Sequence, residues 1–198
     1  MLGKSAAFFG AAAALALANQ NSLFAEIFLT AKANRVETMD ENVKRIVDHI
    51  DIISLVNRFF MSVDERDYAV MKNCLTERVE FDYSRLFGTK MPPTAGGLVE
   101  NVRQNHAGLR ATQHLTANHT VTISGDRAEC TANFQAQHFL PNERGTSLWM
   151  VAGRYKFALT RTSGGWKIRG CTIFPTWTDG NLNIFDLAHE QAKNNRKN

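Results

Sequence analysis

The sequence predicts an α+β protein in which a strongly curved antiparallel sheet wraps around a pocket. Apolar residues recur at helical spacing between residues 38 and 109, and beyond residue 109 they alternate with polar residues as in half-buried strands. Helices therefore come first and a long antiparallel meander follows, which is typical of an α+β fold. Bulky residues gather on one face of the long strands, so we expect this face to bend around a pocket.

The bulk composition favours a single domain with a core of its own. The chain has 198 residues, of which 44% are hydrophobic, and a core forms at this length without a metal or disulfide bonds. The formal net charge is only +4, and the basic residues are scattered apart from the tail KNNRKN. Nucleic-acid-binding domains usually carry a basic stripe with aromatic residues between, so we expect no nucleic-acid partner. The three cysteines are widely separated, and we interpret them as small buried hydrophobic residues.

The first 33 residues differ in composition from the rest of the chain. Lys4 precedes an apolar run over residues 6–18 that contains small residues near its end, which is the layout of a secretory signal peptide. A flexible N-terminal extension is the alternative. The run is too short to span a bilayer, so we expect no stable membrane insertion after processing. The predicted location is periplasmic or secreted, with a cytoplasmic location as the alternative.

The domain itself is predicted over residues 38–190, with residues 191–198 as a frayed basic tail. Its first helix is expected to begin near Thr38 or Asp40, which are candidate N-caps. The apolar stripe of this helix comprises Ile46, Ile50, Ile53, Val56, Phe59, Phe60 and Val63. The stripe ends in a carboxylate, Asp64, at a position where another apolar residue is expected.

Short elements connect this helix to the long strands. Residues 65–75 are expected to form a short helix and residues 78–84 a strand, with Tyr83 on its apolar face. A proline-containing loop follows over residues 85–97, and residues 97–109 have the spacing of another amphipathic helix.

A β-hairpin is predicted over residues 109–140, with Gly125-Asp126 at the centre of its turn. On the second arm small and apolar residues alternate with polar ones, and this alternation places His138 on the apolar face. The hairpin thus carries a histidine among apolar neighbours.

The first arm of the hairpin carries another histidine, His114, whose parity conflicts with that of the apolar residues after it. In a regular strand His114 and Val121 cannot both face the interior, because successive side chains point to opposite faces. A β-bulge around residues 116–118 would bring both inward. We therefore predict a bulge there, and without it His114 has no role in the pocket.

Two further strands, residues 147–161 and 166–174, are expected to complete the meander. Their bulky side chains, together with one from the hairpin, suggest an apolar wall that contacts a substrate; the candidates are Phe134, Trp149, Tyr155 and Phe174. Each of these residues could equally belong to the ordinary core.

Ionisable side chains on apolar faces are the main functional signal. Asp64, Tyr83 and His138 each fall on an inward position by local periodicity. Buried ionisable groups are costly unless they are paired, so they tend to lie near one another. Taken singly, each has a structural explanation: a helix cap, a core tyrosine with its hydroxyl at the rim, or a satisfied core histidine. The functional interpretation depends on the set.

Between Val43 and Asp186 the chain resembles the scytalone dehydratase and SnoaL-like branch of the nuclear-transport-factor-two-like superfamily. The segments that carry the resemblance include FDY, TQH and GWKI, in this order and at this spacing. The resemblance implies a cystatin-like cone, in which a strongly curved antiparallel sheet wraps around a pocket closed by N-terminal helices. Relatives are often dimers or trimers, so a homo-oligomer is expected by analogy.

The resemblance also implies a catalytic set and a reaction. Asp64 and His114 match the family's aspartate–histidine pair, with His114 as general base and then acid. Tyr83 matches a tyrosine that polarises the substrate carbonyl, and His138 would help a hydroxyl leave. The implied enzyme is a cofactor-independent hydro-lyase that removes water from a small hydrophobic β-hydroxy carbonyl compound, aromatic or polycyclic compounds included. Such an elimination needs a base of near-neutral pKa, a donor for the enolate oxygen and a dry pocket. We expect neither a metal nor a cofactor.

The chain differs from the family pattern at the positions that contact the substrate. Val63 replaces a second water-holding tyrosine, and Gly153 and Tyr155 stand where a serine and an asparagine contact substrate. The family's substrate is therefore not transferred, although Val63 remains a candidate contact. An isomerase or a retro-aldol lyase could use the same groups, because these reactions also pass through an enolate. Non-catalytic alternatives are a ligand-binding or oligomerisation module and the small subunit of a ring-hydroxylating dioxygenase.

Overall fold

The computed structural model describes the backbone of residues 5–195 and the side chains of residues 26–194, in two compact units that divide between Asp48 and His49. Helix α1 (Ser5–Asp64) contributes to both units. In the part of the chain that the structure describes, no helix has the length and apolar character needed to cross a membrane. Lys4 of the predicted signal peptide and the last three residues of the predicted tail lie outside the described residues.

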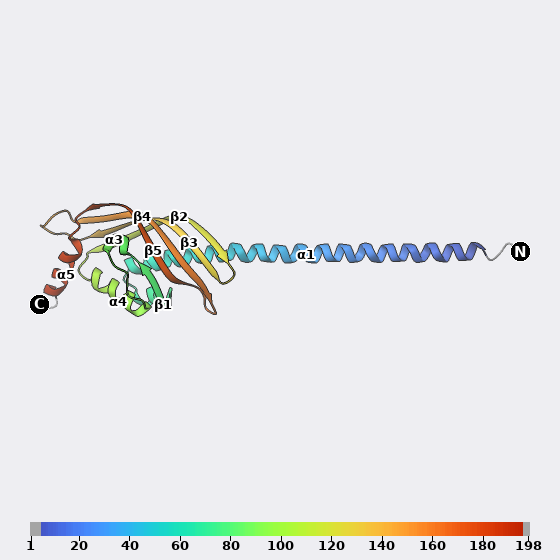
Figure 1. The fold of residues 1–198 in the computed structure, drawn as a ribbon, viewed down its shortest axis with the longest axis horizontal. Coiled ribbons are helices and arrows are strands. Elements are labelled where there is room, and N and C mark those ends of the chain that lie inside the picture. Colours follow the sequence, from blue (N-terminus) through green and yellow to red (C-terminus); the bar gives the residue numbers. More distant parts are fainter. Residues whose placement is uncertain (1–4, 196–198) are drawn as a thin grey trace. The chain divides into compact units, whose positions relative to one another are not determined.

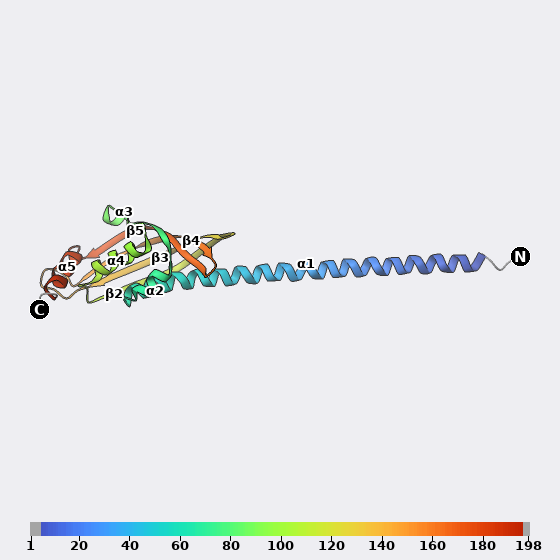
Figure 2. The ribbon, with the colours of Figure 1, turned by 90° about the horizontal axis from the view of Figure 1, so that it is seen from below.

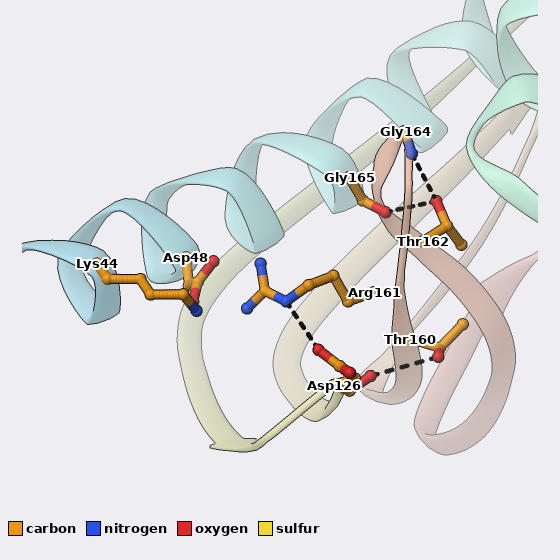
Figure 3. A network of polar contacts seen from close by, with 8 residues as sticks. All are labelled: Lys44, Asp48, Asp126, Thr160, Arg161, Thr162, Gly164 and Gly165. Carbon is orange, nitrogen blue, oxygen red and sulfur yellow. Dashed lines mark hydrogen bonds and ion pairs between the residues drawn. The ribbon is translucent and has the colours of Figure 1, made fainter. Parts of the chain in front are cut away.

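The predicted start of the first helix near residue 38 is wrong. Thr38 and Asp40 lie inside α1, and the Thr38 hydroxyl donates to the carbonyl of Asn34 at 2.8 Å instead of capping a helix start. The physical reason is that no glycine or proline occurs between residues 11 and 64, so nothing stops the helix from extending toward the N-terminus. In the first unit, Lys44 pairs with Asp48 one turn further along at 3.1 Å (Figure 3).

The last turns of α1 supply one layer of the core of the second unit. Six apolar residues there are buried: Ile52, Leu55, Val56, Phe59, Phe60 and Val63. Burial of a side chain of this size contributes about 1.5–3 kcal/mol, so this stripe anchors the end of the helix. The predicted stripe extended too far toward the N-terminus, because Ile46 and Ile50 are 60% and 58% exposed.

A curved, open sheet of five strands forms the other layer of the second unit (Figure 1). The strands are β1 (Leu75–Asp82), β2 (Ala111–Ser124), β3 (Arg127–Phe139), β4 (Leu148–Thr162) and β5 (Gly165–Gly180), in the spatial order β1-β5-β4-β3-β2. The predicted antiparallel meander from β2 to β5 is confirmed. The first strand differs, because β1 pairs with β5 in parallel, so the sheet is mixed and has β1 and β2 at its edges.

Four shorter helices complete the second unit: α2 (Tyr68–Asn73), α3 (Ser84–Phe87), α4 (Ala95–His106) and α5 (Ile184–Asn195). The expected helices near α2 and α4 are confirmed, whereas α3 lies within the segment expected to be a loop. The Thr94 side chain caps α4 by accepting from the amide of Gly97 at 3.1 Å. Helices α4 and α5 pack against each other (Figure 1). The three cysteines are buried and free, as expected.

The turns of the two long hairpins are joined by polar contacts (Figure 3). In the β2–β3 turn, Asp126 accepts from the guanidinium of Arg161 at 3.2 Å and, through its carbonyl, from the Thr160 hydroxyl at 3.3 Å. In the β4–β5 turn, the Thr162 hydroxyl donates to the carbonyl of Gly165 at 2.8 Å and accepts from the amide of Gly164 at 3.2 Å. These contacts fix the ends of the strands that carry the pocket.

The predicted bulge in β2 is confirmed. The pairing of β2 with β3 shifts between Ala117 and Thr120, and Asn118 adopts a left-handed conformation with φ of 55°. Because the extra residue reverses the alternation, His114 before the bulge and Val121 after it both face inward. This irregularity gives His114 access to the interior.

The predicted position of Phe174 on the apolar wall is wrong, because the pairing of β5 is irregular. The pairing of β4 with β5 skips Arg169, so the parity of β5 reverses after that residue. Ile173 is buried in consequence, and the Phe174 ring lies instead beneath the guanidinium groups of Arg85 and Arg154, at 4.7 and 5.5 Å.

Candidate active site

A cavity of about 370 Å³ lies within the second unit. Side chains from helices α1 to α5, from strands β1 to β5 and from the segment between α3 and α4 line it, and most are apolar or aromatic. Of the predicted site residues, the lining includes Val63, Tyr83, His114, His138, Trp149 and Tyr155. A cavity of this size, with few polar groups in an apolar wall, is typical of a small-molecule site.

Asp64 and His114 form a hydrogen-bonded pair at the side of this cavity. The carboxylate oxygen Oδ1 of Asp64 lies 2.6 Å from the imidazole Nδ1 of His114. The side chains are 20% and 9% exposed, respectively. Asp64 itself does not line the cavity, so it stands behind the imidazole and holds it.

The hydrogen bonds of Asp64 fix the tautomer of His114. Burial would raise the pKa of Asp64, but the hydrogen bonds and charge of His114, with the Thr112 hydroxyl, outweigh burial and lower that pKa below its usual value. An ionised carboxylate can only accept, so Nδ1 of His114 carries the proton that the pair shares. The other ring nitrogen, Nε2, then has a free lone pair and can act as a base.

The position of β2 at the edge of the sheet explains why the pair forms. The backbone N–H of His114 points away from β3 and donates to Oδ2 of Asp64 at 2.7 Å (Figure 2 shows α1 ending beside β2). On the same face of β2, the Thr112 hydroxyl donates to Oδ1 of Asp64 at 2.8 Å, and the Thr116 hydroxyl donates to Asn57 at 3.1 Å. Three alternating side chains thus join the edge strand to the last turns of α1.

A column of stacked rings supports the imidazole. Phe60 stacks on His114 with centroids 5.2 Å apart, and on its other side it contacts Tyr155 at 4.9 Å. Phe134 continues the column, stacked on Tyr155 at 3.9 Å. Phe134 faces inward as predicted but does not line the cavity. It lies behind the ring of Tyr155 and so is not at the position expected for a substrate contact.

Two phenols meet on the cavity wall. The Tyr83 ring is stacked against that of Tyr155, with centroids 6.4 Å apart, and both residues line the cavity. Burial raises the pKa of both tyrosines well above the usual value, so both phenols stay protonated. A protonated phenol can donate a hydrogen bond to a ligand oxygen. The sequence suggested a substrate contact for Tyr155 but not its position beside Tyr83.

His106, for which the sequence predicted no role, lies beside the other two pocket histidines. Its ring lies 6.4 Å from His114 and 5.6 Å from His138, and the rings of His114 and His138 are 5.7 Å apart. One signal could have found it: His106 follows Leu98 and Val102 at four-residue spacing on the apolar face of α4.

His106 and His138 are neutral in the folded protein. Burial, with the charge of His114, lowers the pKa of His106 to about 3. Burial and the same neighbour lower the pKa of His138 well below its usual value. These two imidazoles can exchange hydrogen bonds with a ligand but do not bring a positive charge into the cavity.

One predicted contact of the site, that of Phe174, is wrong. Phe174 does not line the cavity, because the bulge at Arg169 turns it to the other face of β5. Gly153, at the position where the family has a serine, is a close-contact position: a Cβ there would lie 2.2 Å from the carbonyl oxygen of Phe174. Among the described residues, no group of three or more His, Cys, Asp or Glu side chains has the geometry of a metal site.

Comparison with known proteins places these features in a family context. Residues 44–172 match the family model of the SnoaL-like domain, whereas no curated protein sequence matches the chain. The Kfla4162 protein from Kribbella flavida is similar over 72% of this chain and 99% of its own, with 24% identity and a TM-score of 0.68. A scytalone dehydratase-like protein from Novosphingobium aromaticivorans is similar over 68% of this chain and 88% of its own, with 17% identity and a TM-score of 0.61.

A third similar structure is the hexachlorocyclohexane dehydrochlorinase LinA-type3 from Novosphingobium barchaimii. The similarity covers 72% of this chain and 96% of that protein, with 16% identity and a TM-score of 0.59. At these identities the likeness is one of fold: a curved sheet and helices around a pocket.

Proposed function

The chain belongs to the SnoaL-like domain family, and on that premise we propose that it is a cofactor-independent lyase whose base is His114. The observation that carries the proposal is the Asp64–His114 pair, with the imidazole in the cavity wall and the carboxylate behind it. Two structures of the same fold are named for eliminations, one of water and one of hydrogen chloride. An elimination of this kind begins with removal of a proton from carbon, which is the step that a braced imidazole can perform.

The proposed reaction is the dehydration of a small hydrophobic β-hydroxy carbonyl compound. Nε2 of His114 takes the proton from the carbon next to the carbonyl, and the C–H electrons form an enolate. The hydroxyl of Tyr83, which lines the cavity beside Tyr155, donates a hydrogen bond to the enolate oxygen. The enolate then re-forms the carbonyl while the C–O bond to the β-hydroxyl breaks. The proton on His114 joins the departing hydroxide, so the products are water and an α,β-unsaturated carbonyl compound.

The remaining pocket residues have supporting roles in this scheme. Asp64 holds the Nδ1–H tautomer of His114 and stabilises the imidazolium that forms during the reaction. His138 is neutral, so it assists the departing hydroxyl as a hydrogen-bonding group and not as a cation. The aromatic wall excludes water, which strengthens each of these polar interactions.

The proposal is tested by turnover of apolar β-hydroxy ketones, followed through the ultraviolet absorbance of the enone. General acid–base assistance typically contributes about 10²–10⁴ in rate, and we expect His114→Ala to lose a factor in this range. We expect Asp64→Asn to lower kcat as well, because an amide no longer enforces the same tautomer. Matched controls are Asp51→Asn, an exposed aspartate on the same helix, and Gln113→Ala, an exposed neighbour on β2; both should keep wild-type turnover.

Two outcomes would contradict the proposal. In one, both site variants retain full turnover of a compound that the wild type converts. In the other, the wild type binds the ketones but neither releases water nor exchanges the α-proton with deuterated solvent, which favours a non-catalytic ligand-binding module. If the α-proton exchanges without loss of water, the same base serves an isomerase or a retro-aldol lyase.

A further inference from the structure

Helix α1 carries an exposed stripe of apolar side chains in the first unit. Five large apolar residues, at spacings of three, four or seven, are each more than half exposed: Leu29, Val36, Met39, Val43 and Ile46. The part of the first unit that the structure describes, residues 5–48, is this helix alone. An exposed apolar patch with this continuity is typical of a surface that binds a partner.

The spacing of the stripe is that of a coiled coil. In a heptad repeat written abcdefg, Leu29, Val36 and Val43 occupy position a. Met39 and Ile46 occupy position d, and positions a and d are those that face a partner helix. The outward positions b, c and f hold no large apolar residue between residues 29 and 48. The β-branched valines at position a favour two strands.

The charged residues beside the stripe favour a parallel arrangement. In a parallel pair, each g position faces the e position five residues further along the other helix. This places Arg35 of one copy beside Asp40 of the other, twice by symmetry. In an antiparallel pair g faces g and e faces e, so these opposite charges would not meet. Lys32 occupies the first d position, where its long stem can lie along the stripe while the ammonium group reaches water.

The balance of charge favours a second copy of the chain over a lipid surface. Residues 29–48 carry four basic side chains, Lys32, Arg35, Lys44 and Arg45, and four acidic ones, Glu37, Asp40, Glu41 and Asp48. Helices that lie on membranes are instead rich in lysine and arginine on their polar face. Four of the five stripe residues also lie beyond residue 33, so they remain in the chain if the predicted signal peptide is removed.

We propose that residues 29–48 of α1 form a parallel two-stranded coiled coil with the same segment of a second copy of this chain. The pairing covers the stripe of each copy with that of the other. The inference is independent of the proposed function, because none of the five stripe residues lines the cavity.

Sedimentation equilibrium of the full chain tests the pairing. The wild type should be a dimer, and Val36→Glu combined with Val43→Glu should raise its dissociation constant about 100-fold or more, because each helix would bury two charges. Glutamate has a higher helix propensity than valine, so the helix itself is retained. The matched control, Thr30→Glu combined with Thr38→Glu, adds the same charge at positions b and c and should leave the dissociation constant unchanged.

Oxidative cross-linking tests the orientation. A residue at position d faces its own counterpart in a parallel pair, so Met39→Cys and Ile46→Cys should each give a disulfide-linked dimer. An antiparallel pair can bring the counterparts together in at most one of these two variants. Thr38→Cys, at an outward position, should stay unlinked, and the three natural cysteines are buried.

The inference is overturned if the full chain is a monomer, or if the two glutamates at positions 36 and 43 leave the dissociation constant unchanged. A mass that falls to one third in that variant would contradict two strands. The inference also fails if the wild type stays monomeric and binds phosphatidylglycerol vesicles through the stripe. Circular dichroism of each variant establishes that it is folded.

Discussion

At the scale of single residues, the pocket is defined by histidines with different surroundings. His114 has a carboxylate partner at Nδ1, whereas His106 and His138 lie within 6.4 Å of it without any carboxylate of their own. Burial keeps these two neutral, so the imidazole that we propose as the base lies beside imidazoles that do not compete for the proton.

The buried neutral histidines predict that the protein loses stability in mild acid. Both have pKa values lowered in the folded state, while in the unfolded chain a histidine has a pKa of about 6.5. Below that pH the unfolded chain binds protons that the folded protein does not, so the free energy of unfolding falls as the pH drops from about 6.5 toward about 3. The slope is at most about 1.4 kcal/mol per pH unit for each histidine.

Urea unfolding at several pH values between 7.5 and 4.5 measures this slope. His106→Gln should reduce the slope of the free energy of unfolding against pH by the contribution of one histidine. The lowered pKa of Asp64 also makes the protein less stable in acid, but at lower pH. Its stabilising contribution is present above the usual pKa of an aspartate and is lost as the pH falls through the pKa of Asp64 in the folded protein. Equal slopes for His106→Gln and the wild type would show that His106 is not the buried neutral group described here.

At the scale of elements, the bulge in β2 decides whether the site exists. Without the shift between Ala117 and Thr120, the apolar half of β2 and His114 would face opposite sides of the sheet. The edge position of β2 then lets its free backbone N–H reach Asp64. A local irregularity and an edge strand together let the β-hairpin supply one half of the Asp64–His114 pair that we propose is catalytic.

Substitution of Asn118 tests the role of this bulge. Asn118 has a φ of 55°, which glycine adopts freely and a β-branched residue does not. We expect Asn118→Gly to preserve stability within about 1 kcal/mol and Asn118→Val to lose about 1–3 kcal/mol, with a fall in turnover as His114 shifts. Chemical denaturation measures the stabilities, and Thr122→Val, at a regularly paired, exposed position of the same strand, is the control. The bulge has no such role if Asn118→Val is as stable and active as the wild type.

At the scale of the whole molecule, much of the fold could be predicted because its periodicities are local. The parity conflict around His114 predicted a bulge, and the alternation of β3 placed His138 inward. The inward position of Asp64 followed from its place at the end of an apolar stripe.

Other features depend on tertiary contacts that the sequence pattern does not contain. The shift at Arg169 reverses the phase of β5, and Phe174 faces away in consequence. The parallel pairing of β1 with β5 joins segments far apart in the chain. His106 reaches the pocket only because α4 packs where it does. The predicted homo-oligomer and the predicted export signal stay predictions.

The central claim is that Asp64 holds the His114 imidazole by an Nδ1–H hydrogen bond at the wall of a dry cavity, and proton NMR of histidine-¹⁵N-labelled protein tests it most directly. A short, shielded hydrogen bond of this kind should give a strongly downfield imidazole proton at neutral pH that couples to a histidine ring nitrogen. The signal should disappear in both His114→Ala and Asp64→Asn and persist in Asp51→Asn. A spectrum without such a proton, or one in which the signal survives Asp64→Asn, would contradict the claim.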